Sequence, residues 1–122
     1  MTRTAGLVLA AGEGRRFGGP KAPFVLEGER LVDRAVRVLR EGGCEPVLVV
    51  LGAWVDDVPG ADVVRNDGWA EGMGSSLRCG LAALEGREEV DRVLVSLVDL
   101  PGLTTVAVRR LLDVDADLAA AA

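Results

Sequence analysis

Charged and glycine residues gather in one short stretch near the start of this 122-residue chain. Residues 9–21 read LAAGEGRRFGGPK and hold four glycines, two arginines and the only lysine of the protein, Lys21. Glycine lets backbone N–H groups approach an anion closely, and cationic side chains complete such a cradle. The stretch therefore predicts a loop that binds the phosphates of a nucleotide.

Two further stretches place polar residues after apolar runs. Residues 66–76 read NDGWAEGMGSS and begin with the only asparagine, and residues 96–102 read SLVDLPG and contain Asp99. A carboxylate at a strand end suits a hard divalent ion such as Mg²⁺, and a helix N-terminus suits an anion or a base edge. Simpler interpretations stay open, because Asp99 would also cap a Pro-Gly turn and residues 66–76 would also form an ordinary glycine-rich turn.

The elements that must position these stretches alternate along the chain. Apolar runs without clean alternation predict strands buried on both faces at residues 5–10, 46–51 and 92–98, with a short extended piece at 62–66. Helical periodicity covers residues 31–40 and 75–84, the second with a serine at or near its cap. Thr104 or Thr105 is expected to cap a third helix with an apolar face of Val106, Val108, Leu111 and Leu112.

This alternation predicts a parallel sheet with helices on both faces. Ligands collect at the carboxyl ends of such strands, so the three polar stretches should meet at one edge. No linker or repeat divides residues 1–122, which we expect to form one domain. The chain ends on four alanines without a turn, and we expect the fold to continue past them.

Composition narrows the function classes. A net charge of −5 disfavours a nucleic-acid binder, and no apolar run or leader-like segment suggests a membrane or secreted protein, so a cytoplasmic location is expected. The chain has no histidine, and Cys44 and Cys79 stand far apart, which argues against a zinc site.

Two common phosphate-binding motifs fit the first stretch poorly. A dinucleotide fingerprint needs a third glycine where Phe17 stands, and no acidic residue closes the second strand at Gly52–Ala53. A P-loop needs Gly-Lys-Ser/Thr, whereas here the sequence is Pro20-Lys21-Ala22. The loop must bind its nucleotide in another way.

The pattern LAAGEGRRFG followed by GPK resembles the signature loop of the MobA-like nucleotidyltransferases, in which Leu-Ala-Ala/Gly-Gly-x-x-x-Arg-Phe/Met-Gly runs on to a lysine. The stretches NDGWAEGMGSSL and LVDLP look like the middle and acidic motifs of the same family. The set is most similar to the molybdenum cofactor cytidylyltransferases and spans residues 7 to about 112. It implies a three-layer α/β/α Rossmann-like fold of the nucleotide-diphospho-sugar transferase type with a mainly parallel sheet, incomplete on the C-terminal, acceptor side.

The resemblance also implies roles for individual residues. Lys21 and Arg16 would contact the triphosphate, and Asp99 would hold Mg²⁺, so these three are the expected catalytic residues. The remaining nucleotide-binding positions it implies are Leu9, Ala10, Ala11, Gly12, Gly14, Asn66, Gly74 and Ser75. Two further residues keep two interpretations each. Arg15 would either bind the phosphates or remain solvated, and Trp69 would either form a wall of the substrate pocket or pack in the core.

The implied reaction is transfer of a nucleoside monophosphate from an NTP, with CTP favoured by Ala10-Ala11-Gly12, to the phosphate of an acceptor such as molybdopterin. Pyrophosphate would leave, and a molybdoenzyme or its chaperone would be a further partner. The alternatives are a guanylyltransferase, a sugar-phosphate nucleotidyltransferase, or a nucleotide-binding module without catalysis.

Overall fold

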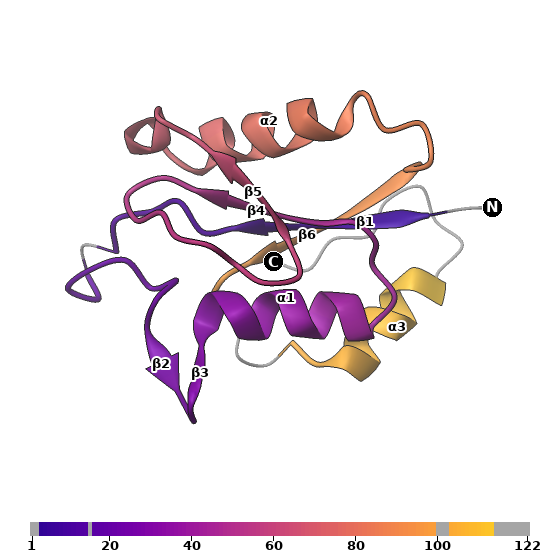
Figure 1. Ribbon diagram of the computed structural model, residues 1–122, viewed down its shortest axis with the longest axis horizontal. Coiled ribbons are helices and arrows are strands. Elements are labelled where there is room, and N and C mark those ends of the chain that lie inside the picture. The colour runs from indigo at the N-terminus through magenta and orange to yellow at the C-terminus, as the bar shows by residue number, and fades with distance from the viewer. Residues whose placement is uncertain (1–2, 15, 100–102, 114–122) are drawn as a thin grey trace.

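The computed structural model describes residues 3–14, 16–99 and 103–113. Its centre is a parallel sheet in the order β5-β4-β1-β6 (Figure 1), formed by β1 (Thr4–Leu9), β4 (Val47–Leu51), β5 (Asp62–Arg65) and β6 (Arg92–Leu97). The helical elements are α1 (Leu31–Glu41), η1 (Trp69–Glu71), α2 (Met73–Leu84) and α3 (Thr105–Asp113). Within the described residues, no helix has the length and apolar character of a membrane span.

The three-layer arrangement follows from the side-chain alternation of β1. Ala5, Leu7 and Leu9 pack into the cluster that includes Leu84 of α2, and Val8 packs into the opposite cluster with α1 and α3. Figure 1 shows α2 on one face of the sheet and α1 with α3 on the other. Because β1 is buried along its whole length, its sequence lacks the polar alternation of a strand with one solvated face.

The strand order reverses at β1. From β1 the chain passes through α1 to β4 and then to β5 on one side of β1. From β5 it crosses through α2 to β6 on the other side of β1. The connections that leave the carboxyl edge therefore diverge to opposite faces beside β1. Such a switch point opens a crevice at the ends of the strands, where open α/β sheets bind their ligands.

The predicted strands and helices are present; the structure corrects the face of α3 and the cap of α2, and it decides between the two threonines proposed to cap α3. The expectation that Val106 belongs to the apolar face of α3 is wrong, since it is 59% exposed while Val108 is fully buried. The two positions lie about 200° apart around a helix, so they cannot face the same layer. Thr104 rather than Thr105 caps α3, because its Oγ1 accepts the N–H of Ala107 at 3.1 Å. The serine expected at or near the cap of α2 does not fill the cap itself: Gly72 occupies that position, with no side-chain cap, and Ser75 follows inside the helix.

A short hairpin that the sequence pattern does not predict lies between the first loop and α1. Strand β2 (Val25–Leu26) pairs antiparallel with β3 (Glu29–Arg30). The turn residues Glu27 and Gly28 both have positive φ, at 54° and 82°. That geometry favours Asn-Gly or Asp-Gly, and Glu-Gly gives a much weaker signal.

We expect the free energy of unfolding to fall between pH 9 and pH 11 because of Cys44. Burial raises the pKa of this thiol from 9.0 to about 11. The unfolded chain therefore loses the thiol proton first, and stability that is complete below pH 9 falls as the pH rises through this window. The loss should reach about 2 kcal/mol near pH 10.5.

Urea unfolding at pH 8 and pH 10.5 measures this loss, and the Cys44→Ala variant is the control whose stability should change less between the two. The chain has no tyrosine and one lysine, so few other side chains titrate in the window. Equal pH dependence in both proteins would contradict the assignment.

Candidate functional site

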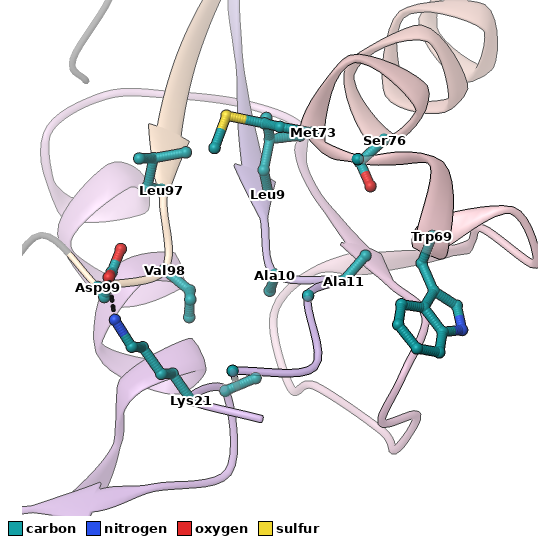
Figure 2. Close-up of a pocket in the computed structure, with 14 residues that line it drawn as sticks. Leu9, Ala10, Ala11, Lys21, Trp69, Met73, Ser76, Leu97, Val98 and Asp99 are labelled. Atoms are coloured by element: carbon teal, nitrogen blue, oxygen red, sulfur yellow. Dashed lines mark hydrogen bonds and ion pairs between the residues drawn. The ribbon is translucent and has the colours of Figure 1, made fainter. Parts of the chain in front are cut away.

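A cavity of about 340 Å³ opens at the carboxyl edge of the sheet, beside the switch point (Figure 2). The ends of β1 and β6, the first loop and the start of α2 all contribute to it. Its lining consists of Leu9, Ala10, Ala11, Gly12, Gly14, Lys21, Ala22, Trp69, Gly72, Met73, Ser76, Leu97, Val98 and Asp99. The three polar stretches of the sequence therefore meet, as their placement after strands predicts.

One end of the cavity carries an ion pair between residues 78 positions apart. Lys21 Nζ donates a hydrogen bond to Asp99 Oδ2 at 2.7 Å, and both side chains are 37% exposed (Figure 2). At this exposure the pair contributes at most about 1 kcal/mol to folding. The two charges can therefore serve a ligand without being needed to hold the fold.

The backbone around Lys21 is anchored to the beginning of α1. The carbonyl of buried Ala22 accepts the N–H of Val32 at 3.1 Å, and the carbonyl of Lys21 accepts the N–H of Phe24 at 3.0 Å. The Phe17 and Phe24 rings meet edge to face at 4.9 Å, and Lys21 Nζ lies 5.9 Å from the Phe17 ring centroid. The ammonium group is thus held at the end of the cavity that carries the ion pair.

The glycine-rich loop closes on the carbonyl of Gly14. This oxygen accepts the N–H groups of Phe17, Gly18 and Gly19 at 3.0, 2.9 and 3.0 Å. Gly14 has a φ of +63°, and a Cβ added there would lie 1.9 Å from the Gly19 carbonyl oxygen. Only glycine fits this position without opening the loop.

Gly14→Ala is therefore expected to lower the free energy of unfolding by about 1–3 kcal/mol, through strain at a positive φ and the backbone clash. If the loop holds a nucleotide, its affinity should fall as well. Chemical denaturation and calorimetric titration measure the two effects. Gly86→Ala is the matched control, because a Cβ there meets no atom within 4 Å. Identical stability of both variants would contradict the closed loop.

The opposite end of the cavity is formed by Trp69 and the start of α2. Figure 2 shows Trp69 and Ser76 on the far side of Ala11 from the Lys21–Asp99 pair. A Cβ on Gly52 would lie 2.6 Å from the Trp69 Cβ, so Trp69 packs directly on the chain after β4. This end is mainly apolar, and it suits the flat face of a ring.

Seven of the expected site residues line the cavity: Leu9, Ala10, Ala11, Gly12, Gly14, Lys21 and Asp99. Arg16 is exposed on the loop and outside the lining, and Gly74 is exposed near the start of α2. Asn66 and Ser75 are buried beside the cavity and hydrogen-bonded to each other. Arg15 and the end of the acidic motif, residues 100–102, lie outside the described residues.

Sequence reasoning missed Ser76, which lines the cavity while Ser75 does not. The register of α2 decides which serine faces the site. That register depends on the helix beginning at Met73, two residues before the predicted start.

The donor set for a metal is small. Among the described residues no group of three or more histidine, cysteine, aspartate or glutamate side chains could hold an ion. Asp99 is the carboxylate in the cavity lining. Mg²⁺ commonly binds one or two carboxylates together with waters and substrate phosphates, so a single aspartate fits an ion that arrives with a nucleotide.

Comparison with known proteins decides the family. The sequence profile of the MobA-like NTP transferase domain matches residues 6–122. The chain belongs to this family. The resemblance carried by the three loops is confirmed, and so is the α/β fold.

Two curated relatives with different names match this chain in sequence. The chain is 44% identical over 115 residues to "Nicotine blue oxidoreductase" of Paenarthrobacter nicotinovorans, covering 88% of this chain and 54% of that protein. It is 61% identical over 46 residues to "Probable molybdenum cofactor guanylyltransferase" of Opitutus terrae, covering 38% of this chain and 23% of that protein. This chain therefore spans about half the length of the first of these relatives.

Solved structures support the same fold. Rv0371c from Mycobacterium tuberculosis superposes with a TM-score of 0.76 at 28% identity, over 92% of this chain and 60% of that one. A nucleotidyl transferase from Methanothermobacter thermautotrophicus gives a TM-score of 0.77 at 26% identity, over 89% and 56%. A manganese complex of Rv0371c gives a TM-score of 0.69 at 27% identity, over 91% and 58%.

Proposed function

We propose that this domain binds CTP and transfers its cytidylyl group to the phosphate of a small acceptor, molybdopterin, with release of pyrophosphate. The observation that carries the proposal is the ion pair of Lys21 and Asp99 at one end of a cavity floored by the glycine-rich loop. A cation and a metal-binding carboxylate at the same point suit a triphosphate and its divalent ion.

The residues divide the work of phosphoryl-group chemistry between them. Lys21 would hold the β- and γ-phosphates and balance the charge that develops on pyrophosphate as it leaves. Arg16, exposed on the same loop, would add a second cation once the triphosphate lies over it. An acceptor phosphate oxygen forms a bond to the α-phosphorus of CTP, and the bond from that phosphorus to the bridging oxygen breaks.

Asp99 is the residue that would hold Mg²⁺, together with the phosphates of the nucleotide. The bound ion supplies charge stabilisation on the transferring group. The manganese complex of Rv0371c supports a divalent ion in a protein of the same fold. Mg²⁺ itself is our proposal for this chain.

The choice of CTP depends on Ala10-Ala11-Gly12, the variant of the signature loop that favours cytidine in the family resemblance. GTP is the competing donor, since the relative of 61% identity over 46 residues is named a guanylyltransferase. Molybdopterin is proposed as the acceptor because the loops resemble those of molybdenum cofactor cytidylyltransferases, and the name of the Opitutus terrae relative refers to the same cofactor. We propose a molybdoenzyme or its chaperone as the protein that receives the product.

A panel of CTP, GTP, ATP and UTP with Mg²⁺, scored by thermal shift, tests the donor. Binding raises the melting temperature because ligand stabilises only the folded chain. We expect CTP to give the largest shift. A larger shift with GTP would reassign the donor, and no shift with any NTP would overturn the proposal. Binding without pyrophosphate release in the presence of acceptor would indicate a binding module.

A redox enzyme is the second candidate, favoured by the 44% identity to a protein named an oxidoreductase. NADH and NADPH therefore belong in the same panel. A shift with either dinucleotide and none with the four NTPs would favour this candidate over nucleotidyl transfer.

A further inference from the structure

The side chain of Asn66, which follows β5, joins the loop after it to α2. It is 4% exposed. Its Nδ2 donates to Ser75 Oγ at 3.0 Å and to Ser76 Oγ at 3.1 Å, and its Oδ1 accepts the N–H of Gly68 at 2.9 Å. Both N–H groups of this buried amide and its oxygen therefore have hydrogen-bond partners in the protein.

The orientation of this amide is fixed by chemistry. The backbone N–H of Gly68 can only donate, so the atom that faces it must be the amide oxygen. A flipped amide would place two donors against each other. The Asn66 nitrogen must consequently face the two serines, with one hydrogen for each hydroxyl oxygen.

The two serines then differ in where their own hydroxyl hydrogens go. Ser75 donates to the carbonyl of Gly68 at 3.2 Å, which closes a small ring of hydrogen bonds. Ser76 accepts from Asn66, and within the described residues its O–H has no protein acceptor. Ser76 lines the cavity, and Figure 2 shows its oxygen on the side of Ala11 and Trp69.

We propose that Asn66 is a positioning residue that holds Ser76 as a hydrogen-bond donor toward the cavity, where Ser76 recognises an acceptor atom of the nucleotide base. The inference rests on the proposed function, which places the triphosphate at Lys21 and hence the nucleoside at the opposite end. A carbonyl oxygen or an unprotonated ring nitrogen is the matching chemistry. Asn66 and Ser75 would act through Ser76 rather than by touching the ligand.

The test replaces the amide NH₂ group of Asn66, which donates two hydrogen bonds, with a carboxylate oxygen, which can only accept them. In Asn66→Asp the carboxylate still accepts from Gly68, but both serine hydroxyls must donate to it, which turns the Ser76 hydrogen away from the cavity. We expect the Kd of Mg²⁺–CTP to rise about tenfold in Asn66→Asp and in Ser76→Ala, with no further rise in the double variant. Ser96→Ala, which removes another buried hydroxyl that lies outside the cavity lining, is the matched control and should bind as the wild type does.

Inorganic tripolyphosphate with Mg²⁺ separates base recognition from general damage. Its affinity should be equal in the wild type and in all three single variants, because it has no base. Ser76→Ala keeps the test open if the charge in Asn66→Asp unfolds the chain. Unchanged CTP affinity in Ser76→Ala would overturn this inference alone. Failure of the wild type to bind CTP and tripolyphosphate would overturn the proposed function with it.

Discussion

Lys21→Ala is expected to weaken Mg²⁺–CTP binding about 10- to 100-fold and to reduce turnover by about 10²–10³-fold. The chain has no second lysine, and the ammonium group of Lys21 is the cation in the cavity lining. Removing it takes away the lysine cation that balances the negative charge on pyrophosphate as it departs. Calorimetric titration measures the affinity, and pyrophosphate release in the presence of acceptor measures the turnover.

The control for Lys21→Ala is a second ion pair that lies outside the cavity. Arg87 and Asp62 meet at 3.0 Å, and neither lines the cavity. Arg87→Ala removes a partly exposed cation from such a pair and should leave CTP affinity unchanged. Both variants should lose at most about 1 kcal/mol of stability. A comparable loss of CTP affinity in Arg87→Ala would assign the effect to net charge instead of to the site.

Asp99→Asn is expected to change nucleotide binding in opposite directions with and without metal. With Mg²⁺ present, CTP should bind more weakly and turnover should fall by about 10²-fold or more, because the carboxylate that holds the ion is gone. In EDTA, CTP should bind at least about threefold more tightly than to the wild type. The substitution removes a negative charge and frees Lys21 from its 2.7 Å partner.

Asp62→Asn is the matched control, since Asp62 also holds an arginine by an ion pair and lies away from the cavity. Its affinities with Mg²⁺ and with EDTA should equal those of the wild type. Weaker CTP binding to Asp99→Asn under both conditions would contradict the role of the carboxylate as a metal ligand.

The sequence predicts the frame of this site better than its details. Buried strands and amphipathic helices follow from local periodicity, and the rule for parallel sheets brings Lys21 and Asp99 to one edge although 78 positions separate them. Their direct contact at 2.7 Å needs the three-dimensional arrangement of two loops and the anchoring of Ala22 on α1.

The details that the sequence does not predict correctly all depend on how the helices pack against the rest of the domain. Val106 is apolar and suits the helix pattern, but a nine-residue helix packed on one side buries only one stripe, and Val108 occupies it. The sequence predicts a serine at or near the cap of α2, whereas Gly72 takes the cap and the buried Asn66 amide holds Ser75 and Ser76 inside the helix. Which of the two serines faces the cavity depends on the register of α2. The sequence alone does not predict that register, because the two serines are adjacent and chemically identical.

The most direct test of the account exchanges the two charges of the site. The double variant Lys21→Asp with Asp99→Lys keeps an ion pair at the same point, so its melting temperature should stay close to that of the wild type. Calorimetric titration with Mg²⁺–CTP should then give clear binding to the wild type and none to the exchanged protein, because cation and carboxylate face the wrong partners. Equal affinity for CTP in the two proteins would contradict the assignment of Lys21 to the triphosphate and of Asp99 to the metal.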